Sequence, residues 1–250
     1  MDLRPATDDD AAAIERIAIA NDDHQAPGYV THLREHGTFL VASLDGVVTG
    51  YSATREVGQA TMLCDLFVDP PFHGQGIGHR LLTQIFDGAG ERFTYASRDP
   101  RAMPLYVRHG MVPRWPLLYL SGPPIAAGSQ ARKVSPAEAA AAEHDLTGED
   151  RTADYAFWGT GLIVYDGTTV VAAGAMDRDI LLHLSPADEP ALLAALSVLE
   201  GRRLSLCLPG PHPALPTLLA NRWRIDEYDH YMSSVPDLLD KSRILSPSLS

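Results

Sequence analysis

The sequence predicts an α/β protein made of two copies of one fold. Two β-rich runs flank Asp45-Gly46, and two more flank Asp166-Gly167. An Asp-Gly pair between such runs is a strong hairpin signal. Each hairpin is followed by the same expected order of strand, helix, strand and helix, and corresponding positions lie 112 to 121 residues apart. Since any α/β chain alternates strands and helices, it is the matched hairpins and terminal helices that favour a duplication.

The first half opens with a helix start. Thr7 can cap a helix, Asp10 lies three residues on, and the acidic run suits the positive end of the helix dipole. Ile14, Ile17 and Ala18 then recur at helical spacing. The other elements expected here are a helix over 28–36, strands over 38–44, 47–53 and 62–68, a helix bearing Leu81, Leu82, Ile85 and Phe86, a strand over 93–97 and a helix over 102–109.

The second half is expected to follow a linker. Residues 122–130 are rich in Pro, Gly and Ser and contain few bulky side chains. We therefore predict a first domain over 1–122, a linker over 123–130, a second domain over 131–240 and a tail over 241–250, which is expected to be frayed over 246–250. The elements expected in the second domain are a helix over 135–143, strands over 162–165, 170–173 and 180–184, a helix over 187–200, a strand over 204–208 and a helix over 213–221.

Composition and charge exclude several classes of protein. The chain has a net charge of −12 and its basic residues are spread thinly, which argues against a nucleic-acid partner. No apolar run approaches the roughly 18 residues of a membrane span, and the N-terminus does not resemble a signal peptide. The two cysteines, Cys64 and Cys207, lie in apolar runs, so neither a disulfide scaffold nor a cysteine-rich zinc site is expected. We therefore expect a cytoplasmic protein without a membrane partner.

The most informative segment is a glycine-rich loop at 73–78 between a strand and a helix. Its alternating glycines would let the backbone approach a ligand closely, and the helix that follows would point free N–H groups at it. Such a loop binds anions through backbone N–H groups and needs no lysine. It would supply the local positive field that an anionic ligand requires in a chain of negative net charge. The segment could also be a plain turn, but it does not fit the G-x-G-x-x-G pattern of a Rossmann loop. The Lys-Ser/Thr of a P-loop is also absent.

The segment resembles the cofactor signature of the Gcn5-related N-acetyltransferase (GNAT) family. The family pattern is Arg/Gln-x-x-Gly-x-Gly/Ala after a strand that ends in an apolar-x-Val-x-Pro pattern. Gly76 and Gly78 match the loop, Val68 and Pro70 match the strand end, and His73 stands where Arg or Gln is usual. About 30 residues on, 102–111 resembles the family's second motif, with Leu-Tyr followed by Gly-Met.

The resemblance implies tandem GNAT-like folds, each a mixed, mostly antiparallel sheet flanked by helices. It implies an acyltransferase that uses acetyl-CoA as co-substrate and no metal. The pyrophosphate would bind backbone N–H groups of the loop, and the pantetheine arm would pair with the strand end. The residues implied in cofactor binding are Leu66, Phe67, Val68, His73, Gly74, Gln75, Gly76, Ile77, Gly78, His79 and Arg80.

Two proton transfers would accompany direct attack by an acceptor amine in a ternary complex. Tyr106 is the candidate acid for the departing thiolate, with simple packing of its ring as the alternative. Asp65 is a candidate base, although a structural role, Glu56 or a water chain would also fit. Strand alternation places Asp65 and Cys64 on opposite faces without showing which faces the cleft.

The second half lacks this chemistry. Acidic residues at 188–189 replace the glycine loop, and Leu218 stands opposite Tyr106, so we read 131–240 as a degenerate copy. His32 and His36 have metal-ligand spacing, but no third ligand is evident. The acceptor would be a small-molecule or peptide amine, and a homodimer is left open. The alternative functions are an acyl-CoA-binding sensor or regulatory module without turnover, and a scaffold whose second half binds a partner.

Overall fold

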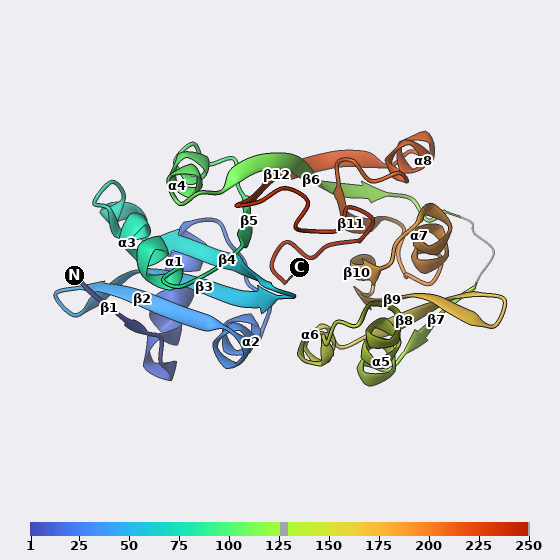
Figure 1. The fold of residues 1–250 in the computed structure, drawn as a ribbon, viewed down its shortest axis with the longest axis horizontal. Helices are drawn as coiled ribbons and strands as arrows, with labels where there is room; N and C mark the ends of the chain where they lie inside the picture. The colour runs from blue at the N-terminus through green and yellow to red at the C-terminus, as the bar shows by residue number, and fades with distance from the viewer. Residues whose placement is uncertain (126–129, 250) are drawn as a thin grey trace. The chain divides into compact units, whose positions relative to one another are not determined.

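The computed structural model describes residues 1–125 and 130–249. The chain divides into two compact units, which are described separately (Figure 1). The first unit comprises Met1–Pro113 and Met232–Pro236, and the second comprises Arg114–Tyr231 and Asp237–Ser250.

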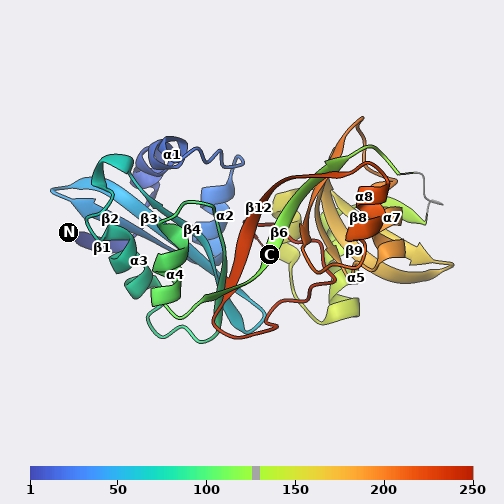
Figure 2. The same cartoon turned by 90° about the horizontal axis from the view of Figure 1, so that it is seen from above.

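The first unit has a mixed sheet in the order β1-β2-β3-β4-β5, in which only β4 and β5 run parallel. Helices α1 and α2 cover one face of this sheet and α3 and α4 cover the other (Figure 2). None of the helices in the described chain is both long and apolar enough to cross a membrane. The elements of this unit are β1 (Asp2–Pro5), α1 (Ala11–Ala20), α2 (Tyr29–His36), β2 (Thr38–Leu44), β3 (Val47–Val57), β4 (Ala60–Val68), α3 (Ile77–Ile85), β5 (Arg92–Ala96) and α4 (Ala102–Arg108).

Local sequence signals explain the first elements. The predicted capping box is present, with the Thr7 backbone N–H donating to Asp10 Oδ2 at 2.8 Å. A short 3-10 turn over Asp8–Asp10 precedes α1, which buries the predicted residues Ile14, Ile17 and Ala18. Asp45 and Gly46 have φ angles of 49° and 81°, the left-handed pair that a two-residue hairpin turn requires.

The core between α3 and the sheet holds in place the helix that follows the glycine-rich loop. Ile77, Leu81 and Leu82 of α3 are each at most 2% exposed and pack with Leu63 of β4. Burying each of these side chains contributes about 1.5–3 kcal/mol. The start of α3 is thereby fixed relative to the end of β4.

The second unit repeats the architecture. Its sheet has the order β12-β6-β11-β10-β9-β8-β7, in which β10 and β11 run parallel and the strand pairs from β10 to β7 and between β11 and β6 run antiparallel. Helix α5 packs on β8 and β9, whereas α7 packs on β7, β8 and β10. The elements are β6 (Val112–Gly122), β7 (Ala131–Val134), α5 (Pro136–Thr147), α6 (Thr152–Trp158), β8 (Gly161–Asp166), β9 (Thr169–Asp177), β10 (Ile180–Ser185), α7 (Glu189–Leu196), β11 (Leu204–Pro209), α8 (Leu215–Ala220) and β12 (Arg224–Ser233).

The two sequence copies have the same element order, from β1 to β6 and from β7 to β12. This confirms the predicted mixed, mostly antiparallel sheets flanked by helices. The sequence patterns missed β1, α6, β6, β7 and β12, of which β1 and β7 have only four residues each. Such elements are held by their neighbours rather than by their own periodicity.

The chain crosses between the two units at the last strand of each copy: most of β6 is counted with the second unit, and β12 enters the first unit only at its end, from Met232. Residues 114–122 of β6 belong to the second unit, where Leu117 to Gly122 pair antiparallel with β11. Residues 232–236 belong to the first unit, where Ser234 N donates to Arg92 O and Arg92 N donates to Ser234 Oγ, both at 2.9 Å. The observed division thus differs from the predicted boundaries at 122 and 131. Of the predicted linker, residues 126–129 lie outside the described residues.

The C-terminal segment packs in the second unit as far as Leu249, in contrast to the frayed end expected over 246–250, of which residue 250 lies outside the described residues. Ile244, Leu245 and Leu249 are each at most 2% exposed, and Ile244 forms a β-bridge with Leu184. These apolar side chains complete the core under β10, which outweighs the usual tendency of chain ends to fray.

Candidate active site

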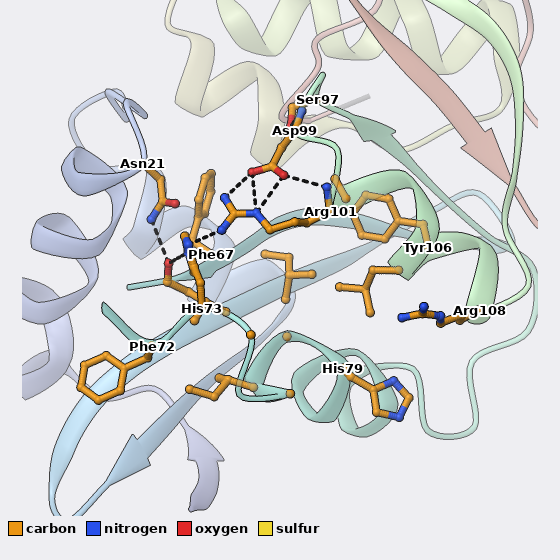
Figure 3. A pocket seen from close by; sticks show the side chains of 18 residues that line it. Asn21, Phe67, Phe72, His73, His79, Ser97, Asp99, Arg101, Tyr106 and Arg108 are labelled. Atoms are coloured by element: carbon orange, nitrogen blue, oxygen red, sulfur yellow. Dashed lines mark hydrogen bonds and ion pairs between the residues drawn. The ribbon is translucent and has the colours of Figure 1, made fainter. Parts of the chain in front are cut away.

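A pocket of about 480 Å³ opens where β4 and β5 separate. The two strands pair from Thr61 and Arg92 to Leu63 and Thr94, and β4 then continues to Val68 alone on that side. The pocket is lined from β4, the glycine loop, α3, the β5–α4 connection and α4 (Figure 3). Its lining residues are Asn21, Leu66, Phe67, Val68, Phe72, His73, Gly74, Gly76, Ile77, Gly78, His79, Ser97, Asp99, Arg101, Ala102, Leu105, Tyr106 and Arg108.

The glycine loop has the backbone geometry that its sequence predicts. Gly74 and Gly76 both have φ = 78°, a left-handed conformation that strains other residues. The first helical hydrogen bond of α3 runs from Arg80 N to Gly76 O at 3.1 Å. The N–H groups of residues 77–79 precede that bond and carry the positive end of the helix dipole. The loop therefore presents N–H donors at the edge of the pocket, as anion binding requires.

His73 lines the pocket, but both of its ring nitrogens are engaged within the protein. Nε2 lies 2.7 Å from Val68 O, so it carries the hydrogen and donates to that carbonyl. Nδ1 is then the acceptor, and it receives a hydrogen bond from Arg101 Nη1. Figure 3 shows Arg101 reaching His73 from the opposite side of the pocket.

The comparisons with known proteins agree with this geometry. Residues 6–111 match the model of the acetyltransferase (GNAT) family. The first unit is a GNAT domain.

Solved structures with the GNAT fold span both units. A candidate acetyltransferase from Pyrococcus horikoshii covers 100% of this chain and 95% of its own at a TM-score of 0.78 and 17% identity. A tandem GNAT protein from the clavulanic acid biosynthesis pathway covers 94% of this chain and 99% of its own, with a TM-score of 0.60 and 13% identity. A GCN5-related N-acetyltransferase from Anabaena variabilis covers 93% of this chain and 72% of its own, with a TM-score of 0.63 and 13% identity. No curated protein sequence matches the chain significantly. At these identities the similarity shows the fold, which is the tandem GNAT fold predicted from the sequence.

A β-bulge decides which way Asp65 points. Asp65 pairs with Ala53 and Leu63 with Thr54, so Cys64 is an extra residue in β4. Leu63 and Leu66 consequently share the face covered by α3, although they are three residues apart. Asp65 points to the other face of the GNAT sheet, where Tyr29 Oη donates to its Oδ1 at 3.1 Å.

Asp65 is chemically suited to accept a proton, but it does not belong to the pocket lining. Gln25 Nε2 donates to its second oxygen at 3.1 Å, and the side chain is buried. Burial and the nearby Asp23 carboxylate raise the pKa of Asp65 to about 7, while the hydrogen bond from Tyr29 opposes this shift. A carboxyl group with that pKa exchanges its proton near neutral pH.

Tyr106 lies where the second GNAT motif predicts, on α4 beside the pocket (Figure 3). Its side chain is 7% exposed and packs in the same core cluster as Leu81 and Met111. The ring thus has both the packing role and the position beside the pocket that the sequence left as alternatives.

The structure brings most of the predicted cofactor residues together. Ten of the thirteen predicted site residues line the pocket, whereas Asp65, Gln75 and Arg80 do not. Sequence reasoning missed Asn21 and the residues of the β5–α4 connection, notably Asp99 and Arg101. No motif marks them, and the one available signal was their position after the carboxyl end of a strand, where ligands bind in α/β sheets.

The corresponding position of the second unit is closed by its own side chains. Asp188 Oδ1 accepts a hydrogen bond from Ala191 N at 2.9 Å and thereby caps α7, where α3 leaves its N–H groups to the pocket. Leu218, at the position opposite Tyr106, is fully buried. These features fit the prediction of a degenerate copy.

The second unit instead buries a polar network. Glu143 on α5 accepts hydrogen bonds from Tyr155 Oη at 2.7 Å and from His183 Nε2 at 2.8 Å, and none of the three is exposed. Burial lowers the pKa of His183, and the pKa of Glu143 is lowered overall by His183 and Arg151 despite its burial. The hydrogen bond from His183 to Glu143 links β10 to α5 inside the unit.

Within the described residues, no group of three or more His, Cys, Asp or Glu side chains is placed to hold a metal ion. The rings of His32 and His36 lie 4.9 Å apart on α2, as helical spacing predicts.

Proposed function

We propose that this protein transfers an acetyl group from acetyl-CoA to an amine acceptor by direct attack in a ternary complex. The observation that carries the proposal is the glycine loop, whose left-handed backbone turns the N–H groups at the start of α3 toward the pocket beside the free end of β4. A Cβ atom on Gly74 or Gly76 would meet no atom within 4 Å, so the loop is glycine for its conformation and its open surface. Both properties suit a bound pyrophosphate.

Acetyl-CoA supplies the activated acyl group as a thioester. The unpaired edge of β4 beyond Leu63 offers backbone groups that would pair with an extended pantetheine arm, and an N–H there would polarise the thioester carbonyl. As the nitrogen–carbon bond forms and the carbon–sulfur bond breaks, the amine loses one proton and the departing thiolate accepts one.

The chain offers a residue for each proton transfer. Tyr106 on the pocket wall is the proposed donor to the thiolate. Asp65 is the proposed acceptor of the amine proton because its pKa of about 7 lets it hold that proton at neutral pH. Its place behind the pocket lining means that a water molecule would carry the proton to it.

The acceptor is proposed to be a small-molecule or peptide amine. The net charge of −12 attracts cationic molecules weakly and without specificity.

An amine library tests this function. Purified protein is incubated with acetyl-CoA and pools of small amines, amino acids and peptides, and acetylated products are detected by mass. Mass detection avoids a thiol reagent, which would also react with the free cysteines of the chain. We expect at least one acetylated amine, formed at a rate that falls in the Tyr106→Phe variant.

A CoA-binding sensor without turnover is the second candidate. It is favoured by the fact that both oxygens of Asp65 already accept hydrogen bonds, from Tyr29 and Gln25. Tight CoA binding together with slow hydrolysis and no acetylated amine would support the sensor and overturn the transferase.

A further inference from the structure

Arg101 crosses the pocket from the side opposite the glycine loop. It immediately precedes α4. Its guanidinium forms two hydrogen bonds to the Asp99 carboxylate, from Nε to Oδ1 at 2.9 Å and from Nη2 to Oδ2 at 2.5 Å. Its third nitrogen, Nη1, donates to His73 Nδ1. Figure 3 shows this chain of contacts running from Asp99 through Arg101 to His73. The guanidinium is thus held by partners from two different segments.

His73 is itself fixed by the end of β4. Its Nε2–H donates to Val68 O, a carbonyl that also accepts from Asn21 Nδ2 at 3.2 Å. This bond sets the ring orientation and leaves Nδ1 as the acceptor that faces Arg101. Hence the backbone at the mouth of the loop determines, through His73, where the guanidinium lies.

The pocket needs such a cation. The chain is strongly acidic, the loop over 73–78 contains neither Arg nor Lys, and Arg80, the cation predicted from the sequence, is exposed and outside the lining. The charged side chains that line the pocket are Asp99, Arg101 and Arg108. A guanidinium has five N–H groups, and Asp99 and His73 occupy three of those on Arg101, so two stay available to an anion.

We propose that Arg101 binds the pyrophosphate of CoA across the pocket from the loop N–H groups, and that His73 acts as its positioning residue. The inference rests on the proposed use of acetyl-CoA and adds the charged contact that the loop itself lacks. A planar guanidinium that is already hydrogen-bonded to a carboxylate loses little conformational entropy when its remaining N–H groups bind phosphate oxygens.

Calorimetric binding of CoA and of dephospho-CoA tests Arg101. Dephospho-CoA keeps the pyrophosphate and lacks the 3′-phosphate, so the two ligands separate these groups. The matched control is Arg132→Gln in the second unit, since the Arg101 and Arg132 side chains are 57% and 53% exposed and each pairs with a carboxylate at 2.5 Å. We expect Arg101→Gln to weaken both ligands by about tenfold, as for a charge-assisted hydrogen bond in a partly exposed site, and Arg132→Gln to weaken neither.

The other outcomes overturn distinct statements. Unchanged affinity in Arg101→Gln, or an equal loss in Arg132→Gln, overturns the role of Arg101. A loss confined to CoA assigns the residue to the 3′-phosphate and overturns the pyrophosphate contact. Failure of the wild-type protein to bind either ligand overturns the proposed function itself, and the inference falls with it.

A variant cycle tests His73. The amide of His73→Gln can still donate to Val68 O and accept from Arg101, whereas His73→Leu can do neither. We expect His73→Leu to weaken CoA binding as much as Arg101→Gln does, and His73→Gln to restore most of the affinity. In the Arg101→Gln background, His73→Leu should add no further loss. Fully additive losses would overturn the positioning role.

Discussion

Tyr29 on α2 donates a hydrogen bond of 3.1 Å to Asp65 on β4. The bond favours the ionised carboxylate, while burial and Asp23 disfavour it and bring the pKa of Asp65 to about 7. A residue on another element therefore influences the proton affinity of the proposed base. A mutation of Tyr29 can change the pKa of Asp65 while Asp65 itself stays in place.

Removing the Tyr29 hydroxyl should shift the pH dependence of catalysis. In Tyr29→Phe the carboxylate loses a stabilising hydrogen bond, so the pKa of Asp65 rises further. Because a base must be unprotonated to act, the acidic limb of kcat/KM should move to higher pH by about half a unit to one unit. Asp65→Asn should abolish this limb. A limb that stays in place, or moves to lower pH, would show that Asp65 is not the titrating base.

The same carboxylate should make stability depend on pH. In the folded protein Asp65 has a pKa of about 7, against 3.8 in the unfolded chain, so between these values the folded state binds more protons. Folding stability contributed by this group is present at low pH and is lost as pH rises toward and through 7. Urea unfolding should therefore show that Asp65→Asn gains stability relative to wild type between pH 5 and pH 8, on the order of 2 kcal/mol. If the difference in unfolding free energy between Asp65→Asn and wild type were the same at pH 5 and at pH 8, the prediction would be contradicted.

A side chain at Gly76 should weaken cofactor binding more than folding. Gly76→Ala strains a backbone with φ = 78°, at a cost of about 1 kcal/mol, and turns the loop N–H groups away from their ligand. Gly58, in the turn between β3 and β4, has φ = 60° and likewise has open space around it. We expect both variants to lose similar stability in thermal unfolding. Only Gly76→Ala should lose CoA affinity, by tenfold or more in calorimetry, and equal affinities would argue against the cradle.

Loss of the Tyr106 hydroxyl should affect turnover and not binding. The Phe ring preserves the packing of this 7%-exposed side chain, so the fold and the CoA affinity should stay close to wild type. Without the phenol the thiolate must leave unprotonated, and kcat should fall by about 10- to 100-fold. The comparison requires one amine identified in the library screen. If kcat for that amine is unchanged in Tyr106→Phe, the ring has a packing role only.

The two sequence copies should not fold when separated at the predicted linker. A fragment over 1–122 lacks residues 232–236, which hydrogen-bond Arg92 in the first unit. A fragment over 131–250 lacks residues 114–122, which pair with β11 in the second unit. Each fragment exposes an unpaired strand edge and should aggregate or lack cooperative unfolding. Mixing the two fragments during refolding should recover a complex. Cooperative unfolding of either fragment on its own would contradict this dependence on residues 114–122 and 232–236.

Local signals in the sequence were sufficient for much of the fold. The Thr7–Asp10 capping box and the Asp45-Gly46 turn depend on residues a few positions apart, so their geometry is encoded where they occur. The same holds for the glycine loop, in which two left-handed residues set the direction of the backbone at the start of α3. The repeated order of elements then indicated two copies of one architecture.

Contacts between distant residues decided the rest. An extra residue in β4 turned Asp65 toward Tyr29, and strict alternation cannot show where such a bulge falls. The assignment of residues 114–122 to the second unit and of residues 232–236 to the first depends on pairing with residues far away in the sequence. The burial of Ile244 and Leu249 likewise depends on a core that distant segments form.

By itself, then, the sequence determined the repeated fold and the left-handed conformation of the glycine loop, because both arise from local backbone preference and periodicity. Only the tertiary structure decided the pKa of Asp65 and the place of Arg101 in the pocket. The physical reason is that charge and proton affinity depend on burial and on neighbours that the fold brings together from distant parts of the chain.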